Sequence, residues 1–147
     1  MNRDVFEKCV DILYETALEA KERNEVPVSA LLLFEDGTFV TASNRVEEKD
    51  DPFAHAEIEV IRKGFEKTGS RYLKNAVLFV SLEPCLMCMG ALIKAGIKEL
   101  CYVKDDPKLG SLSHYHAYVD DVLKVVRIED KRFDSLLGSF FEDIRNN

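Results

Sequence analysis

With 147 residues, the chain is long enough to bury one hydrophobic core and too short to divide comfortably into two, so we expect a single domain over residues 1–147. An apolar fraction of 46%, with only 7 Gly and 4 Pro, excludes a low-complexity or disordered chain. The net charge of −7 is opposite to that of most nucleic-acid-binding proteins, so such a role would need a local basic patch. Residues 62–74 hold five Lys or Arg against one acid, which fits such a patch or an ordinary solvated helix face.

Membrane and disulfide patterns are both missing from the sequence. No apolar stretch approaches the roughly 20 residues of a membrane helix, and the start of the chain lacks the apolar core of a signal peptide. Cys85 and Cys88 lie three positions apart after a proline, which suits a metal better than a disulfide. Cys9 and Cys101 lie in apolar patterns and are expected to be buried thiols. We expect a cytoplasmic protein without a membrane partner.

The first half of the chain predicts a helix, a hairpin and a second helix. Apolar residues recur at helical spacing through residues 4–23. Residues 28–34 and 38–43 are apolar or β-branched and flank a Glu-Asp-Gly turn, which predicts a hairpin. After a polar stretch at 45–51, helical spacing resumes at about residue 54 and ends near Gly69.

The second half predicts three more strands with a helix between the first two. Residues 76–82 form a continuous apolar run typical of a buried strand. Proline suits the first position of a helix, so Pro84 predicts that Cys85 and Cys88 occupy the opening turn of a helix reaching about residue 95. Strands are expected at 97–103 and 123–128, and a closing helix carries Phe133, Leu136, Leu137, Phe140, Phe141 and Ile144. Residues 104–121 show no clear period. This order predicts an α/β fold of three layers, α/β/α, with a mixed five-stranded sheet.

Two short motifs carry the chemistry, His55-Ala56-Glu57 and Pro84-Cys85-Leu86-Met87-Cys88. One imidazole and two thiolates are typical zinc ligands, and three protein ligands leave the fourth tetrahedral position to water. Helices that follow neighbouring strands can direct their first turns at one place. The pattern therefore predicts catalytic zinc, held by His55, Cys85 and Cys88, rather than a closed structural site.

Glu57 is expected to be the catalytic proton carrier rather than a metal ligand. Zinc lowers the pKa of its bound water to about 7, and a carboxylate two residues after the histidine can reach that water. Taken alone, His-x-Glu is common and Cys-x-x-Cys can be structural or redox-active. Together they match the pattern of zinc-dependent nucleobase deaminases.

The chain resembles the cytidine deaminase superfamily, and within it the bacterial tRNA adenosine deaminases, over nearly all of its length. The matching segments occur in the expected order: Glu25-Val26-Pro27-Val28, Asp51-Pro52, Ala54-His55-Ala56-Glu57, Ser81-Leu82-Glu83-Pro84-Cys85, Asp106-Pro107-Lys108, Leu136-Leu137 and Phe140-Phe141. The resemblance implies the cytidine deaminase-like fold, one Zn²⁺ per chain on the three ligands named above, and a homodimer in which both subunits contribute to the substrate groove.

The same resemblance implies that Asn44 and the backbone at Ala56 bind the target base. Asn44 is equally compatible with a turn residue. Three features depart from the family pattern near the expected substrate entrance: Ser29 replaces a usual glycine, Phe53 a usual threonine, and residues 108–113 a Gly- and Ala-rich turn. Phe53 is a candidate for stacking on a flipped base, or for burial in the core or in a dimer interface.

Three functions are consistent with these observations. The first is hydrolytic deamination of adenosine to inosine at the wobble position of a tRNA anticodon. The second keeps the chemistry but acts on a free base or nucleoside, such as guanine, cytosine or cytidine, for which an acidic surface is no handicap. The third is a non-catalytic, zinc-stabilised RNA-binding subunit, and the presence of Glu57 argues against it.

Overall fold

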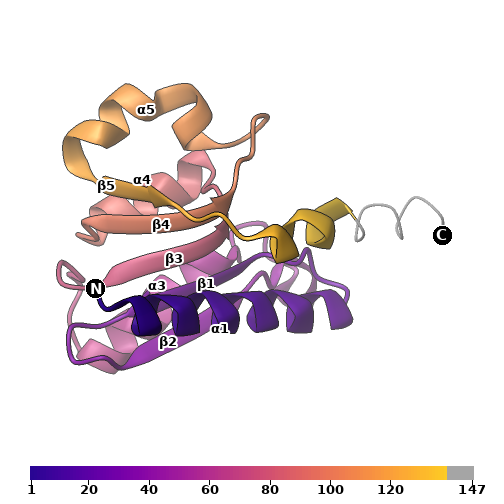
Figure 1. Cartoon of the computed structure of the whole chain (residues 1–147), viewed down its shortest axis with the longest axis horizontal. Helices are drawn as coiled ribbons and strands as arrows, with labels where there is room; N and C mark the ends of the chain where they lie inside the picture. Colours follow the sequence, from indigo (N-terminus) through magenta and orange to yellow (C-terminus); the bar gives the residue numbers. More distant parts are fainter. Residues whose placement is uncertain (139–147) are drawn as a thin grey trace.

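A five-stranded sheet lies between helices on both of its faces in the computed structural model, which describes residues 1–138, with residues 116–118 described by their backbone alone. The elements in chain order are α1 (Arg3–Glu22), β1 (Ser29–Leu33), β2 (Phe39–Ser43), α2 (Val46–Lys49), α3 (Ala56–Thr68), β3 (Val77–Leu82), α4 (Leu86–Lys94), β4 (Glu99–Lys104), α5 (Ser111–Val122), β5 (Lys124–Arg127) and a 3₁₀ turn, η1 (Lys131–Phe133). Figure 1 shows α1 in front of the sheet and α3 and α4 behind it.

The sheet is mixed, with the strand order β2-β1-β3-β4-β5. β1 pairs antiparallel with both β2 and β3, whereas β3, β4 and β5 run parallel. The hairpin turn between β1 and β2 uses Gly37 at φ 88°, a conformation that side chains with a Cβ rarely adopt. The predicted fold class, three layers around a mixed five-stranded sheet, is confirmed.

Successive side chains of the central strands point to opposite faces of the sheet and so divide the hydrophobic core into two clusters. In β1, Ala30 and Leu32 face the cluster formed with α3 and α4, while Leu31 and Leu33 face the cluster formed with α1. Because β1 is buried along its whole length, it needs apolar side chains on both faces. This explains the continuous apolar run that predicted it.

The helix α5 was missed by the sequence analysis, which found no period in residues 104–121. Parallel strands need a crossover connection, and α5 supplies the one between β4 and β5. Tyr115 has non-helical dihedral angles, φ −132° and ψ 29°, so a kink interrupts the helical spacing. The kink in the helix explains why the sequence shows no helical period there.

Smaller differences concern where helices begin and end. α4 begins at Leu86, with Cys85 as its N-cap, so the prediction that Pro84 occupies the first helical position is wrong. The polar stretch at 45–51 contains the short helix α2. Residues 134–138 begin the expected closing helix, and its remainder, with Phe140, Phe141 and Ile144, lies outside the described residues.

Ser29 does not lie at a substrate entrance as expected. It is fully buried at the start of β1, where its Oγ donates to the backbone oxygen of Leu13 in α1 at 2.6 Å. The hydroxyl therefore joins α1 to the sheet. Cys9 and Cys101 are buried thiols, as predicted. Among residues 1–138, no helix has both the length and the apolar character needed to cross a membrane.

Candidate active site

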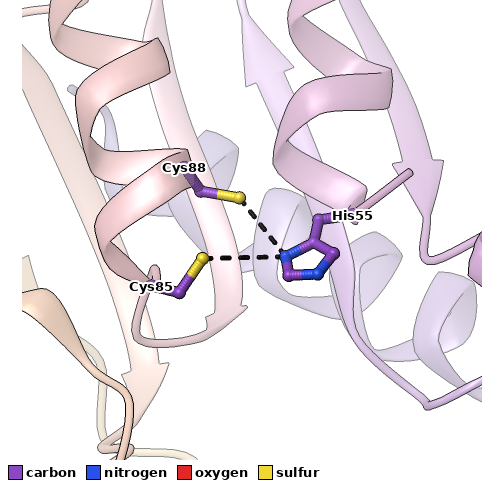
Figure 2. Close-up of side chains that lie close together, drawn as sticks. All are labelled: His55, Cys85 and Cys88. Atoms are coloured by element: carbon purple, nitrogen blue, oxygen red, sulfur yellow. Dashed lines mark hydrogen bonds between the residues drawn. The ribbon is translucent and has the colours of Figure 1, made fainter. Parts of the chain in front are cut away.

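Two helix starts bring the predicted metal ligands together. His55 is the N-cap of α3, Cys85 is the N-cap of α4, and Cys88 lies in the first turn of α4. Figure 2 shows the three side chains pointing toward one another, with Nδ1 of His55 facing both sulfur atoms. The Nδ1–Sγ distance is 3.8 Å to Cys85 and 3.5 Å to Cys88.

These three donors fit a tetrahedral zinc site in both type and spacing. Zn–S bonds of about 2.3 Å and Zn–N bonds of about 2.0 Å, set at the tetrahedral angle, separate nitrogen from sulfur by about 3.5 Å. All three ligand atoms lie within 4.8 Å of one another, which brackets that spacing. Among the residues that the structure describes, they are the only such group of metal-ligating side chains.

Hydrogen bonding at the cluster favours a thiolate. Hydrogen bonds from Cys88 and His55 lower the pKa of Cys85 to about 4. The same hydrogen bond to Cys85, together with burial, raises the pKa of Cys88. One negative charge is therefore already stabilised at the helix start, where backbone N–H groups and the helix dipole also favour anions.

Glu57 lies in the first turn of α3 and is buried, with 4% of its surface exposed. Burial raises the pKa of its carboxyl group above the usual range. Glu57 lines the same cavity as His55 and Cys85. A buried carboxyl group with a raised pKa beside this cluster suits the uptake and return of a proton.

A cavity of about 660 Å³ opens over these residues. This volume is within the range of small-molecule sites. One part of its lining is formed by Asn44, Val46 and Glu47, and another by residues 105–109. The remaining lining residues are Val26, Val28, Ala56, Leu82, Glu83 and Leu137.

Asn44 and Ala56 both line the cavity, whereas Phe53 does not. The Oδ1 atom of Asn44 accepts a hydrogen bond from the backbone N–H of Val46 at 3.2 Å. This orientation leaves its side-chain NH₂ group available to a ligand. Ala56 is the first residue of α3, a position whose N–H has no partner within the helix. Phe53 precedes His55 by two residues, and its ring is 63% exposed.

The sequence analysis assigned no role to two buried carboxylates that hold the cavity walls. Glu25 accepts hydrogen bonds from the backbone N–H groups of Glu47 and Glu48, at 3.0 and 2.8 Å, at the start of α2. Glu83 accepts from the backbone N–H groups of Asp106, which lines the cavity, and Ser113. Both acids adjoin apolar segments, Val26-Pro27-Val28 and residues 76–82, and an acid in that setting was the available signal.

A model of the MafB19-like deaminases matches residues 5–145. A tRNA-specific adenosine deaminase of Aquifex aeolicus is 32% identical over 152 aligned positions, covering 100% of this chain and 99% of the relative. The chain belongs to the tRNA-specific adenosine deaminase family. It is therefore a hydrolytic deaminase, and the non-catalytic alternative is excluded.

Solved structures agree with this deaminase assignment. One, from a study of A-to-I editing by tRNA:A34 deaminases at the wobble position of transfer RNA, has a TM-score of 0.81 and 32% identity, covering 89% of this chain and 99% of its own. The guanine deaminase of Nitrosomonas europaea has a TM-score of 0.76, covering 88% of this chain and 81% of its own. Its 20% identity supports the fold alone.

Replacing one of the metal ligands should abolish tight metal binding by the deaminase. Loss of an outer-shell partner already weakens metal binding roughly 10–100-fold, so we expect Cys85→Ala to weaken zinc binding by more than about 100-fold. Inductively coupled plasma mass spectrometry after dialysis measures the zinc content. Cys101→Ala is the matched control, since Cys101 is a buried cysteine outside the cluster. Equal zinc content in the two variants would contradict the assignment.

Proposed function

We propose that residues 1–147 form one cytoplasmic, zinc-dependent deaminase domain that converts adenosine to inosine at the wobble position of a tRNA anticodon. The observation that carries the proposal is a buried acid, Glu57, beside the His55, Cys85 and Cys88 cluster, at one end of a cavity of ligand size. The substrate is inferred from similarity along 100% of the chain to a tRNA-specific adenosine deaminase.

His55, Cys85 and Cys88 would hold the zinc ion, because their donor atoms have the type and spacing that Zn²⁺ requires. When bound, zinc supplies Lewis acidity that lowers the pKa of a coordinated water molecule to about 7. The helix starts of α3 and α4 keep the three ligands in place before the substrate arrives. This arrangement reduces the reorganisation needed during the reaction.

Glu57 would carry out the proton transfers. Its carboxylate takes a proton from the attacking water and passes it to a ring nitrogen of adenine as oxygen bonds to C6. It then moves the second proton to the exocyclic amine, the C6–N bond breaks, and ammonia leaves. The raised pKa of this buried carboxyl group suits both the uptake of a proton from water and its donation to the substrate.

Asn44 and Ala56 would orient the base. The side-chain NH₂ of Asn44 can donate to a ring nitrogen or carbonyl, and the first backbone N–H of α3 supplies a second fixed donor. An anticodon-loop base can enter this cavity once it is splayed out of its stack. Phe53, exposed two residues before His55, would stack on a neighbouring base.

A free nucleobase or nucleoside is the second candidate substrate. The net charge of −7 favours it, because RNA binding gains most of its electrostatic free energy from neutralised phosphates. Residues 108–113, Lys-Leu-Gly-Ser-Leu-Ser, also differ from the expected Gly- and Ala-rich turn, and Lys108 and Leu109 of this stretch line the cavity. Deamination of either substrate would use the same metal chemistry, and the two possibilities differ only in which substrate the cavity walls admit.

We further propose that the enzyme is a homodimer that uses the outer surface of α4 and α5. A shallow groove of about 220 Å³ on this surface is lined by Leu86, Met89, Ile93 and Tyr115. Leu86 and Tyr115 are exposed by 59% and 53% in the single chain. Large exposed apolar side chains gathered in one groove are characteristic of a protein contact.

Inosine formation tests the proposed substrate. The zinc-loaded enzyme should convert the wobble adenosine of an anticodon stem-loop RNA, detected as inosine by mass spectrometry after nuclease digestion. Its KM should rise with salt, because phosphate contacts weaken as salt increases. A parallel panel of adenine, guanine, cytosine and their nucleosides should release no ammonia. Ammonia from the panel with no inosine in RNA would instead establish the second candidate.

Replacing Glu57 by glutamine should separate turnover from metal binding. The amide keeps the size of the side chain but cannot carry the proton, and general acid–base catalysis contributes about 10²–10⁴-fold. We therefore expect kcat to fall by about 10³-fold while zinc content stays at the wild-type level. Glu66→Gln is the control, since Glu66 is an exposed acid on the same helix. A Glu57→Gln enzyme with near-normal kcat would remove Glu57 from the mechanism.

Leu86→Glu should disrupt the dimer without unfolding the subunit. Leu86 is largely exposed in the single chain, so its replacement removes no core contact, whereas a buried unpaired carboxylate opposes association. Light scattering coupled to size exclusion should show a dimer for the wild type and a monomer for the variant. Val5→Glu changes an exposed position on α1, across the sheet, and should remain dimeric. A monomeric wild type would disprove the assembly.

A further inference from the structure

The carboxylate of Glu83 connects the turn that carries Cys85 to the chain segment 106–113. Its Oε1 accepts the backbone N–H of Asp106 at 2.9 Å, and its Oε2 accepts the backbone N–H of Ser113 at 2.8 Å. The hydroxyl of Ser113 donates to the same carboxylate, at 2.9 Å to Oε1 and 3.1 Å to Oε2. Glu83 itself is buried, with 2% of its surface exposed.

Gly110 permits this close approach. A Cβ atom at position 110 would overlap with Oε2 of Glu83 and with the backbone oxygen of Asp106. The neighbouring Ser111 donates twice to the backbone oxygen of Pro84, from its N–H at 2.9 Å and from its Oγ at 2.7 Å. Glycine is thus the residue that allows the segment to lie directly against the Cys85 turn.

This segment includes most of one wall of the cavity. Asp106, Pro107, Lys108 and Leu109 line it, as does Asn44. Besides the hydrogen bonds that Glu83 and Pro84 accept, a β-bridge between Cys85 and Gly110 joins this segment to the ligand-bearing turn. Lys108 and Leu109 are exposed and add no anchoring core contact. Leu112 packs against the core at the end of the segment, and the links to the Cys85 turn hold the part that lines the cavity.

We propose that Glu83, through Gly110 and Ser113, is a positioning residue that sets the distance between this cavity wall and the metal ligands, and so determines which base the pocket accepts. Both of its carboxylate oxygens are engaged by protein donors, so it acts through the wall and not on the substrate. The specificity role rests on the deaminase function proposed above. The mechanical role, holding residues 106–113 in place, does not depend on that function.

Ser113 offers the cleanest test because its side chain contributes only the hydroxyl bonds. Ser113→Ala removes those bonds and leaves the backbone donor in place. Because hydrogen bonds to a charged group are among the stronger ones, we expect their loss to raise KM for the anticodon stem-loop about tenfold. Zinc content should be unchanged and kcat should stay within about twofold. Ser113→Thr keeps a hydroxyl and should restore KM.

Ser70→Ala is the matched control. Ser70 also makes two hydroxyl hydrogen bonds, both with Tyr72, in an exposed turn that does not line the cavity. KM should therefore stay at the wild-type value. If KM rises equally in Ser70→Ala and Ser113→Ala, or if Ser113→Ala leaves KM and substrate selectivity unchanged, the specificity role is wrong.

Amide hydrogen exchange tests the mechanical role without any activity. In zinc-loaded Ser113→Ala, peptides covering residues 106–113 should exchange faster than in the wild type, while peptides from α1 should not change. Gly110→Ala, which displaces the same segment by overlap, should produce the same local increase. Unchanged exchange in both variants would overturn the proposal. A wild type that exchanges as expected but forms no inosine would instead count against the proposed substrate alone.

Discussion

The chemistry of this deaminase depends on the packing of α3 against α4 on one face of the sheet. Apolar residues of both helices share one cluster, among them Val60 of α3 and Leu92 of α4. Because the two helices pack there, their N-caps, His55 and Cys85, come together although 30 positions separate them in sequence. Helix starts also carry unpaired N–H groups and positive dipole ends, which favour a thiolate and a carboxylate at the same place.

The ligands and Glu57 could be predicted from sequence because each motif is local and its residue types carry the chemistry. His55 and Glu57 share one helix turn, and Cys85 and Cys88 share another, so their relative placement follows from helix geometry. The bond between Glu83 and Ser113 spans 30 residues and depends on α5. That helix forms because β5 runs parallel to β4, a register that no local pattern reveals.

Three buried acids lie at or next to the cavity, and their hydrogen-bond partners distinguish their roles. Glu25 and Glu83 each accept two backbone N–H groups from other segments, so each carboxylate holds a wall. Glu57 accepts no backbone N–H from another segment among the described residues, and desolvation raises its pKa. A carboxylate with both oxygens bonded to backbone N–H groups is held in position, whereas the raised pKa of Glu57 suits proton exchange. The same residue type thus supplies both the scaffold and the proposed proton carrier.

Substrate choice must depend on the cavity walls rather than on the metal ligands. The guanine deaminase of Nitrosomonas europaea shares this fold at a TM-score of 0.76, so the fold itself does not select the base. In this chain, Glu25 holds the Asn44 side of the cavity and Glu83 holds the side formed by 106–109. Neither carboxylate belongs to the His55, Cys85 and Cys88 cluster, so either wall can change its sequence without altering the residues that could hold a metal ion. In this chain, the segments that two buried carboxylates hold in place are therefore where a change of substrate would arise.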